Sequence, residues 1–386
     1  MAPEDAEQHA FDAAALAQTF AKAQGFALCG IASAQASQYA DQLNQWLAQG
    51  KHGSMQYLAN HAEIRVDPGK LVEGAANVIV VADAYNASAH PQNESDDHLP
   101  LGRVAKYAWG DDYHKVLKKR LHTVCNALEA EYPGHIYRAT TDTAPIFERE
   151  LATRAGLGWT GKHTLMIHPR FGSYFLLGTI VTTLPLQTSE LAGFPAPLAT
   201  PTDHCGGCTR CIDACPTDAI AAQGYSIDAR RCISYLTLEH RDAIDEHYHT
   251  PMGHWLAGCD ICQDVCPHNR RRTSAVAQGD DPLQVHTRYT PKPYADGFDL
   301  LDVLNWSADD RQQAFLSSAL KRVKLDMMQR NALIAAGNFL AKNDGPALRD
   351  KVIELARADN PCPMVRDTAA SVCKRLGFPH ESADQS

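Results

Sequence analysis

The chain has 386 residues, of which 45% are hydrophobic and 21% charged, with a formal net charge of −9 at pH 7. This length allows two or three domains with cores of their own, and the composition is that of a soluble globular protein. No apolar run approaches the roughly 18 residues of a membrane span, and the acidic N-terminus is unlike a secretory or twin-arginine signal. We therefore expect a cytoplasmic protein. Its net charge argues against general affinity for nucleic acid, which depends on neutralising phosphates.

The first 190 residues alternate between helical and strand-like hydrophobic spacing, which predicts an α/β or α+β domain. The predicted elements are helices over 11–25, 37–50, 112–131 and 144–155, and strands at 26–31, 77–82, 135–141, 164–167 and 172–181. Near the C-terminus the pattern is purely helical, in short segments that resemble HEAT-like repeats. With a cysteine-rich region between them, the sequence predicts a multidomain α+β protein. Its predicted domains are residues 1–190, 195–272 and 298–386.

The middle domain contains eight cysteines in two runs, each with the spacing of a bacterial two-cluster ferredoxin. The first run consists of Cys205, Cys208, Cys211 and Cys215, and the last of these precedes Pro216. The second run consists of Cys259, Cys262 and Cys266, and the last of these precedes Pro267. Leu256 stands where the second run would begin, so we expect Cys232 to replace the missing cysteine.

In such modules each run gives three thiolates to one [4Fe–4S] cluster, and the cysteine before proline binds the neighbouring cluster. The predicted ligands of cluster one are Cys205, Cys208, Cys211 and Cys266. The predicted ligands of cluster two are Cys215, Cys232, Cys259 and Cys262. Disulfides or four-cysteine zinc sites could use the same residues. A reducing cytoplasm disfavours disulfides, and the spacing before proline favours iron–sulfur clusters over zinc. The chain is therefore expected to transfer electrons.

Two other motifs fail on inspection. Residues 156–163 almost match a phosphate-binding P-loop, but His163 stands where a Mg²⁺-binding hydroxyl belongs, and a predicted helix precedes the loop in place of a strand. The Cys-x3-Cys-x2-Cys pattern of a radical-SAM enzyme is absent from both cysteine runs. The Asp-x-His-x2-Gly signature of histidine-ligated cobalamin begins at Asp245, but Thr250 occupies its glycine position. These readings exclude an NTPase and a radical-SAM enzyme.

Asp142 lies between a predicted strand and a predicted helix that has Pro145 in its first turn. The structural interpretation is an N-cap, which is the usual role of Asp at this position. The functional interpretation is a reactive group, because α/β domains often place such groups where a strand leads into a helix.

Several motifs occur together and in order, and through them the chain resembles the epoxyqueuosine reductase family over nearly its whole length. They are Asp-x-x-Pro-x-x-Glu-Arg at 142–149, Gly-Trp-x-Gly-Lys at 158–162, and the ferredoxin-type module with Arg-Cys-Ile-Ser-Tyr at 231–235. Residues 53–57, 65–68 and 107–114 agree, and they are also similar to the vitamin B12-binding core that this family shares with reductive dehalogenases.

The resemblance implies an α/β cobalamin-binding core, a ferredoxin-like two-[4Fe–4S] module and a C-terminal HEAT-like helical domain. The family reduces epoxyqueuosine, at the wobble position of certain tRNAs, to queuosine in the last step of queuosine biosynthesis. Removing the epoxide oxygen takes two electrons and two protons. The family uses base-off cobalamin, cycling between cob(II)alamin and cob(I)alamin, to gather the single electrons of the clusters for attack on the epoxide.

By the same resemblance, Asp142 is the general acid that protonates the leaving oxygen, and it lies against the cofactor. Arg65, Ser234 and Asp260 are then expected to bind cobalamin, and Ala105 stands where some relatives carry a cysteine. A general acid must be protonated when substrate is bound, so we expect desolvation to raise the pKa of Asp142.

Three basic runs interrupt the acidic composition, and each alone is more often a solvated face than a phosphate site. They are Lys115, Lys118, Lys119 and Arg120; Arg270, Arg271 and Arg272; and Lys321, Arg322, Lys324 and Arg330. The resemblance makes the last two runs expected contacts for the phosphates of a tRNA anticodon stem-loop, whose bases would be read by stacking. The expected partners are this tRNA and an external low-potential electron donor, with no membrane, and the expected state is a monomer.

Two alternatives remain at this level. A cobalamin-dependent reductase of a small molecule, similar to the reductive dehalogenases, would share the core and the clusters, but it has no use for the C-terminal helices. A ferredoxin fused to scaffolding domains would transfer electrons only, and it predicts that no corrin binds.

Overall fold

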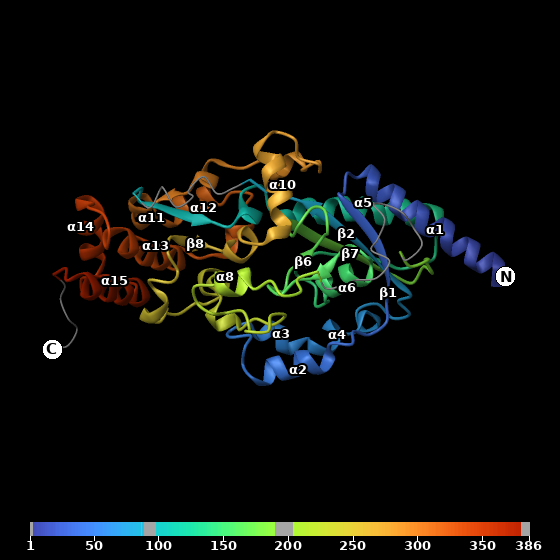
Figure 1. Ribbon diagram of the computed structural model, residues 1–386, viewed down its shortest axis with the longest axis horizontal. Coiled ribbons are helices and arrows are strands. Elements are labelled where there is room, and N and C mark those ends of the chain that lie inside the picture. The colour runs from blue at the N-terminus through green and yellow to red at the C-terminus, as the bar shows by residue number, and fades with distance from the viewer. Residues whose placement is uncertain (1–2, 86, 89–97, 190–203, 380–386) are drawn as a thin grey trace.

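The protein has a mixed helix-and-sheet fold that is elongated along one axis (Figure 1). The computed structural model describes residues 3–85, 87–88, 98–189 and 204–379. A four-stranded sheet and α1 occupy one end, α11–α15 form the other end, and the cysteine-bearing segment lies between them. Within the described ranges, no helix is both long and apolar enough to cross a membrane.

The four-stranded sheet is antiparallel throughout and has the order β1-β2-β7-β4. Its strands are β1 (Leu28–Ser33), β2 (Asn77–Ala84), β4 (Tyr137–Thr140) and β7 (Phe175–Thr182). Every residue of β2 is buried, because helices cover both faces of the sheet. The strands predicted at 26–31, 77–82, 135–141 and 172–181 are therefore confirmed, with ends that shift by up to three residues.

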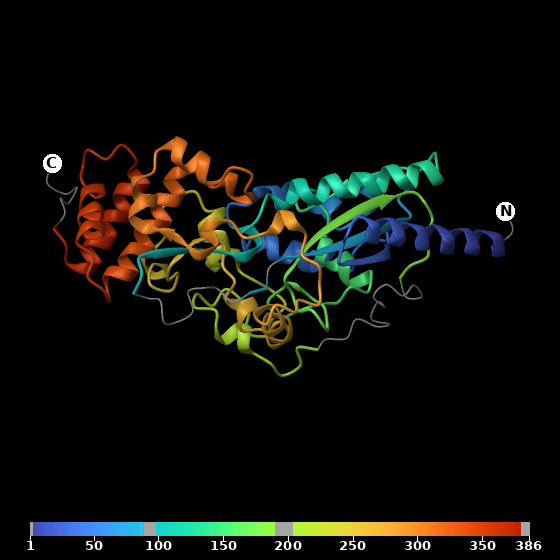
Figure 2. The ribbon, with the colours of Figure 1, turned by 90° about the horizontal axis from the view of Figure 1, so that it is seen from above.

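Two long helices cover one face of this sheet and a short helix covers the other. α1 (Pro3–Ala23) and α5 (Tyr113–Glu131) lie side by side (Figure 2), and they bury alanine and leucine side chains against β1 and β7, respectively. α6 (Glu148–Arg154) packs on the opposite face. The helix predicted over 144–155 thus begins four residues late, because residues 141–147 form an irregular turn in which Asp142 has a φ of 52°.

The remaining N-terminal elements are short. They are α2 (Ala40–Ala48), α3 (Gln56–Asn60), α4 (Ala62–Arg65), and the hairpin strands β5 (Trp159–Thr160) and β6 (Met166–Ile167). The helices predicted over 11–25 and 37–50 exist, but the first begins at Pro3 and the second is limited to Ala40–Ala48.

A second, three-stranded sheet connects distant parts of the sequence. β3 (Leu101–Val104) pairs in parallel with β8 (Trp255–Ala257) and antiparallel with β9 (Phe298–Asp299). Leu256 in β8 is fully buried, and an added Cβ at Gly102 would lie 2.3 Å from its side chain. Leu256 is therefore a core residue, which explains why a leucine stands where the second cysteine run would begin.

The cysteine-bearing segment is built from short helices joined by loops. They are α7 (Arg210–Asp213), α8 (Ile233–Leu238), α9 (Ile261–Asp264) and the longer α10 (Pro267–Ala277). α7 and α9, one from each cysteine run, pack against each other. This contact brings the two runs together, as two shared clusters require.

The C-terminal part is helical, as the sequence predicts. Its helices are α11 (Leu300–Asn305), α12 (Ala308–Ala314), α13 (Leu325–Leu340), α14 (Pro346–Leu355) and α15 (Pro363–Leu376). Among the described residues, the 3-10 helices are η1 (Pro68–Lys70), η3 (Lys106–Ala108), η4 (Ala229–Arg231), η5 (Glu246–Tyr248), η6 (Thr287–Tyr289), η7 (Pro293–Asp296) and η8 (Ala319–Arg322). α13 packs on α11, α14 and α15, and also on β8, so the helical end shares a core with the middle of the molecule.

One arginine of each basic run is buried. The expectation that Arg272 and Arg330 contact tRNA phosphates is therefore wrong. Arg120, in the first run, is also buried and cannot contact a phosphate. Arg120 binds the carboxylate of Asp83, and Arg272 binds that of Asp281. A buried guanidinium must be paired, and hydrogen bonds inside the protein satisfy all three. The exposed members of the three runs are Lys115, Lys118, Lys119, Arg270, Arg271, Lys321, Arg322 and Lys324.

Replacing Arg330 with Ala should destabilise the fold by at least about 3 kcal/mol, because its guanidinium donates to three backbone carbonyls. These belong to Leu236, His240 and Asp242, at 2.7, 2.8 and 2.6 Å. Denaturant unfolding of the cluster-loaded protein measures the loss, and Lys324→Ala is the exposed control, expected within about 0.5 kcal/mol of wild type. Equal stability of both variants would contradict a structural role for Arg330.

Candidate cluster sites and candidate active site

The four cysteines predicted for cluster one line a single cavity. Cys205, Cys208, Cys211 and Cys266 surround about 310 Å³ of space that no protein atom fills, part of it open to solvent. Burial, with a smaller contribution from the neighbouring thiols of Cys205 and Cys211, raises the pKa of Cys266 to about 11. Four adjacent thiolates repel one another unless positive iron offsets their charge, so this donor set fits an iron–sulfur cluster.

The β5–β6 hairpin forms one wall of this cavity. Lys162 donates hydrogen bonds from its Nζ to the carbonyl oxygens of Gly206 and Cys208, at 2.5 and 3.1 Å. These bonds fix the loop that carries the first two cysteines. The cavity is completed on the same side by His163 and Ile167.

The four cysteines predicted for cluster two are also neighbours. Burial raises the pKa of Cys259 and of Cys262 well above the ordinary range, and the thiol of Cys232 raises both further. The thiol of Cys215 likewise raises the pKa of Cys232 and that of Cys262. Cys211, from the first set, also raises the pKa of Cys262, so the two sets of cysteines lie next to each other.

The cysteines are all free thiols. All twelve of them lie within the described ranges, and none is in a disulfide. Across those ranges, no group of three or more His, Cys, Asp or Glu side chains closes around the position of a single metal ion.

Asp142 is not an N-cap, which corrects the structural interpretation of this residue. The cap position of α6 is Phe147, and the left-handed backbone at Asp142 turns its carboxylate toward α5. There Oδ2 accepts hydrogen bonds from the hydroxyl of Tyr113 at 2.7 Å and from Nε2 of His114 at 3.0 Å. Half of the Asp142 side chain is exposed, so an incoming ligand can reach it.

His114 lies between two carboxylates. Its Nδ1 donates to Asp112 at 2.8 Å, while Nε2 donates to Asp142. Burial acts to lower the pKa of His114, but hydrogen bonds to both carboxylates and their charges outweigh it and raise the pKa to about 9. His114 therefore carries a positive charge at neutral pH.

The pKa of Asp142 is lowered to about 2, opposite to the direction we expect for a general acid in the presence of substrate. Partial burial acts to raise this pKa, but hydrogen bonds from His114 and Tyr113 and the charge of His114 outweigh it. Without substrate, then, Asp142 is an anion, and of its two hydrogen-bond donors His114 is the stronger acid, because the pKa of Tyr113 is raised well above its usual value.

Glu148 and Arg65 complete the surroundings of Asp142. Glu148 accepts the backbone N–H of Asp142 at 2.8 Å, and burial together with the charge of Asp142 raises its pKa to about 8. Arg65, at the end of α4, lies near enough for Asp142 and Glu148 to act on its pKa. The Nε of Arg65 is buried, and among the described residues it has no hydrogen-bond partner. Because buried N–H groups are nearly always paired, this N–H of Arg65 is suited to donate a hydrogen bond to a bound ligand.

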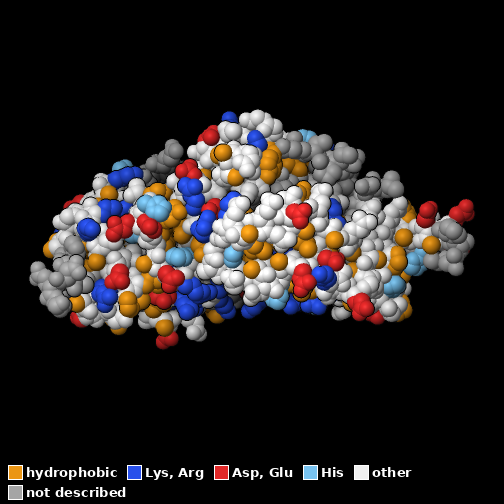
Figure 3. Space-filling view, turned by 90° about the horizontal axis from the view of Figure 1, so that it is seen from below, with side chains coloured by type: hydrophobic (Ala, Val, Ile, Leu, Met, Phe, Trp, Pro, Cys, Tyr) orange, Lys and Arg blue, Asp and Glu red, His pale blue; other side chains and the backbone are white. Residues whose placement is uncertain are grey.

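A residue from the C-terminal part also reaches this site. Arg322 of η8 forms an ion pair with Glu239 at 2.8 Å, and the charge of Asp142 acts on its pKa. Tyr57 of α3 is 48% exposed, and its pKa responds to Arg65, Arg322 and Asp142. The site is thus bordered by cations from both halves of the chain. On the face shown in Figure 3, Lys and Arg side chains gather near the middle of the molecule and along its lower edge.

The other predicted cofactor residues lie beside cluster two. The N–H of Ser234 donates to the sulfur of Cys232. Asp260 is buried, and its carboxylate accepts the N–H of Lys106 at 2.7 Å. Ala105 is buried and packs in the same apolar cluster as Cys232. The charges of Asp142 and Asp260 both act on Tyr107, which lies between the two sites.

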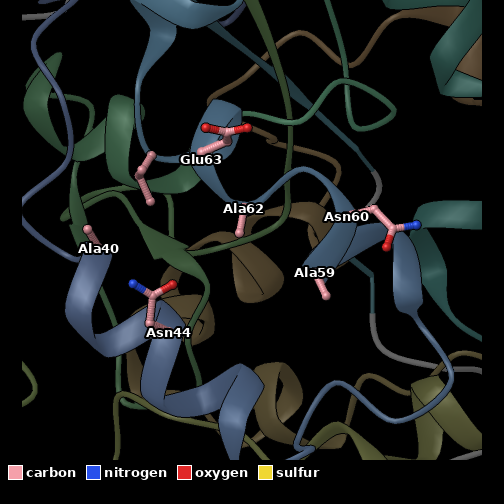
Figure 4. Close-up of a pocket in the computed structure, with 7 residues that line it drawn as sticks. Ala40, Asn44, Ala59, Asn60, Ala62 and Glu63 are labelled. Atoms are coloured by element: carbon pink, nitrogen blue, oxygen red, sulfur yellow. The ribbon is translucent and has the colours of Figure 1, made fainter.

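A separate open pocket lies among α2, α3 and α4 (Figure 4). Its polar lining consists of Asn44, Asn60 and Glu63, and Glu63 is paired with Lys70 at 2.9 Å. The pocket offers hydrogen-bonding groups but lacks the paired acid and base found at Asp142.

The positions of Tyr113, His114, Glu148 and Arg322 at this site do not follow from the sequence pattern. The first three lie within the motifs at 107–114 and 142–149, which is the only signal in the sequence that points to them. Arg322 belongs to a basic run, and only the packing of η8 shows which member of that run faces the site.

Family models match two parts of the chain. Residues 204–269 match a 4Fe-4S double cluster binding domain, a span that includes all eight predicted ligands. Residues 65–143, from Arg65 through Asp142, match a model described as epoxyqueuosine reductase QueG, DUF1730. The fold and the sites therefore define an iron–sulfur oxidoreductase.

Comparison with similar proteins identifies the family to which the chain belongs. An epoxyqueuosine reductase from Cyclobacterium marinum is 40% identical over 80% of this chain and 91% of its own length. One from Xanthomonas campestris is 39% identical over 86% of this chain and 89% of its own length. A crystal structure of an epoxyqueuosine reductase with an epoxyqueuosine-modified tRNA-Tyr stem loop superposes with a TM-score of 0.79. It is 28% identical and covers 94% of this chain and 90% of that chain. The chain belongs to the epoxyqueuosine reductase family, in preference to the dehalogenase-like alternative.

In the folded protein the His114–Asp142 pair should be ionised from about pH 2 to about pH 9. The raised pKa of His114 contributes stability that is complete below 6.5 and lost as the pH rises through about 9. The lowered pKa of Asp142 contributes stability above 3.8 that is lost as the pH falls through about 2.

In Asp142→Asn the pKa of His114 should fall toward 6.5, because one of its two carboxylate partners is removed. NMR titration of histidine-labelled protein measures this pKa, and Asp41→Asn, an exposed carboxylate on α2, is the control. An unchanged pKa in Asp142→Asn would show that the two side chains do not form the pair described.

Proposed function

We propose that this protein reduces epoxyqueuosine to queuosine at the wobble position of tRNA, the last step of queuosine biosynthesis. The observation that carries the proposal is the proton-rich cluster of Tyr113, His114 and Glu148 around an exposed carboxylate at Asp142. This cluster lies within the span that matches the epoxyqueuosine reductase model, or directly beside it. The relatives and the tRNA-bound neighbour support the choice of substrate.

The second part of the proposal is that base-off cobalamin binds against Asp142. The residues present fit this cofactor: Arg65 offers a buried N–H with no partner among the described residues, suited to the amide side groups of a corrin. Ser234 and the turn at Asp260 would contact it from the side of cluster two. Bound cobalamin would supply a two-electron centre, and the two [4Fe–4S] clusters would deliver electrons to it singly.

The chain's own acid–base groups then supply protons. In the open site the ion pair of Asp142 and His114 is stable, because water and Arg322 stabilise the carboxylate. When cofactor and nucleoside exclude water, a neutral pair is favoured over a charged one, so the proton moves from Nε2 of His114 to Asp142. Asp142 would then donate it to the epoxide oxygen as a C–O bond of the ring breaks, and a second proton would release that oxygen as water, the two electrons coming from the bound cofactor. A carboxyl group whose pKa is about 2 without substrate can therefore serve as the acid once substrate is bound.

We further propose three functional regions: a cobalamin-binding catalytic core at 1–190, the two-cluster module at 195–272 and a HEAT-like helical domain at 298–386. The packing of α13, α14 and α15 against one another supports the last assignment. The boundary proposed near 190–195 falls on residues outside the described ranges. The protein would act in the cytoplasm as a monomer, with an external low-potential electron donor.

The exposed cations near the site would contact tRNA phosphates. Lys321, Arg322 and Lys324 are exposed and adjacent to the Asp142 site through Arg322. Tyr57 offers an exposed ring on which a splayed base can stack. Arg270 and Arg271 are exposed on α10, and they remain candidates after the exclusion of Arg272.

Single-turnover conversion of epoxyqueuosine in a tRNA stem-loop tests the function. Wild-type protein, reconstituted anaerobically, should form queuosine only when cobalamin is added. Asp142→Asn should slow the reaction by roughly 100-fold or more, because general acid catalysis typically contributes that much. Corrin absorbance checks that the variant still binds cofactor, and Asp41→Asn is the control.

The possible outcomes separate the parts of this proposal. Failure of the fully loaded wild type to convert the tRNA would overturn the substrate assignment. Conversion without cobalamin would overturn the cofactor assignment, and full activity of Asp142→Asn would overturn the role of the acid.

Removing Lys321 and Lys324 together should weaken binding of the stem-loop and flatten its salt dependence. Each phosphate contact contributes about one unit to the slope of log K against log salt concentration, so the slope should fall by about 2. Fluorescence anisotropy at several salt concentrations measures it, and Lys22→Ala on α1 is the control. An unchanged slope in the double variant would place the tRNA elsewhere.

A further inference from the structure

His163 lies in the β5–β6 hairpin with its imidazole turned into the protein. The side chain is 4% exposed and lines the cavity surrounded by the cluster-one cysteines. His163 belongs neither to the proposed catalytic site nor to the proposed cluster ligands. The hairpin belongs to the segment 156–163, which resembles a phosphate-binding loop in sequence but lies against sulfur ligands.

The hydrogen bonds of His163 fix where its proton is. The backbone N–H of Leu165 donates to Nδ1 at 3.2 Å. A ring nitrogen that accepts a hydrogen bond carries no hydrogen, so the proton of the neutral imidazole is on Nε2. Nε2 is buried, and within the described ranges no protein group pairs with it. Since buried donors are nearly always paired, this N–H requires an acceptor that the chain does not provide.

The local backbone holds the ring in this place. An added Cβ at Gly161 would lie 2.4 Å from Cδ1 of Ile167 and 3.1 Å from Cε1 of His163, so a larger residue there would displace the Ile167 side chain and crowd the imidazole. Lys162 ties the hairpin to the carbonyls of Gly206 and Cys208. The position of His163 relative to the cysteines is thus fixed from both sides.

We propose that Nε2–H of His163 donates a hydrogen bond to a sulfur of cluster one and makes the reduction potential of that cluster more positive. The inference rests on the assignment of a cluster to this cavity. A donor close to a cluster sulfur stabilises the added electron of the reduced state more than it stabilises the oxidised state. His163 is thus a positioning and tuning residue for electron transfer, and it does not touch the substrate.

His168 provides a matched control within the chain. Its Nδ1 accepts the backbone N–H of Arg170 at 3.1 Å, just as Nδ1 of His163 accepts that of Leu165. The His168 side chain is 7% exposed. Its ring stacks on Phe171 at 4.6 Å, and it does not line the cysteine cavity. Replacing either histidine removes a similar local hydrogen bond, but only one replacement removes a donor from cluster one.

The test is an EPR-monitored redox titration of the reconstituted protein, which requires neither tRNA nor turnover. In His163→Leu one of the two cluster potentials should become more negative. The expected change is about tenfold in the equilibrium constant for reduction, which equals about 59 mV for one electron. The other cluster should be unchanged, and His168→Leu should leave both potentials as in wild type. His163→Gln keeps an N–H near the position of Nε2 and should restore part of the shift.

Hyperfine spectroscopy of wild-type protein labelled with ¹⁵N-histidine gives an independent readout if His163→Leu does not assemble. A nitrogen coupling to one reduced cluster that disappears in His163→Gln supports the inference, because the labelled ring is then lost. Two assembled clusters with unshifted potentials in His163→Leu, or no histidine coupling in wild type, would overturn it. A wild type whose iron and sulfide content fits one cluster would overturn the cluster-one assignment as well.

Discussion

The structure depends on the exchange of cysteines between the two runs. Cys266, from the second run, completes the cavity of the first, and Cys215 joins the second set, so α7 and α9 must pack together. This packing places the turn at Asp260 against Lys106, whose N–H it accepts. The ring of Tyr107, beside that turn, lies between Asp260 and Asp142. The two cysteine runs and Asp142 are therefore positioned by one continuous set of contacts.

The proton at the site is held by a pair of side chains, and Asp142 alone could not hold it. A lone carboxylate on a strained turn would be an anion at neutral pH and could not act as an acid. The imidazolium of His114, fixed by Asp112 on its other side, keeps a proton 3.0 Å from that anion. Exclusion of water then decides whether the pair is charged or neutral. Arg322 adds a charge from the C-terminal helices, so the helical end of the molecule also contributes to the electrostatics of the site.

Much of this architecture could be predicted from sequence, because cysteine spacing and buried strands leave strong local patterns. The four cysteines predicted to bind cluster one can be grouped by their spacing, and in the structure they line one cavity. The sequence could not show that Arg272 and Arg330 are buried, since a basic run reads the same whether it is solvated or paired inside the protein. Nor could it show that Asp142 faces His114 in place of capping α6, because that depends on a left-handed backbone angle and on contacts between residues 28 positions apart.

The most direct test of this account is the pH dependence of the single-turnover rate at subsaturating tRNA, because that rate reports the pKa values of the protein before substrate binds. If His114 supplies the proton that Asp142 delivers, the wild-type rate should fall as the pH rises through about 9, where His114 loses its charge. In His114→Gln the rate should be low throughout and should lack that transition. A wild-type rate that stays constant well above pH 9, or a His114→Gln variant with the wild-type profile, would contradict the account.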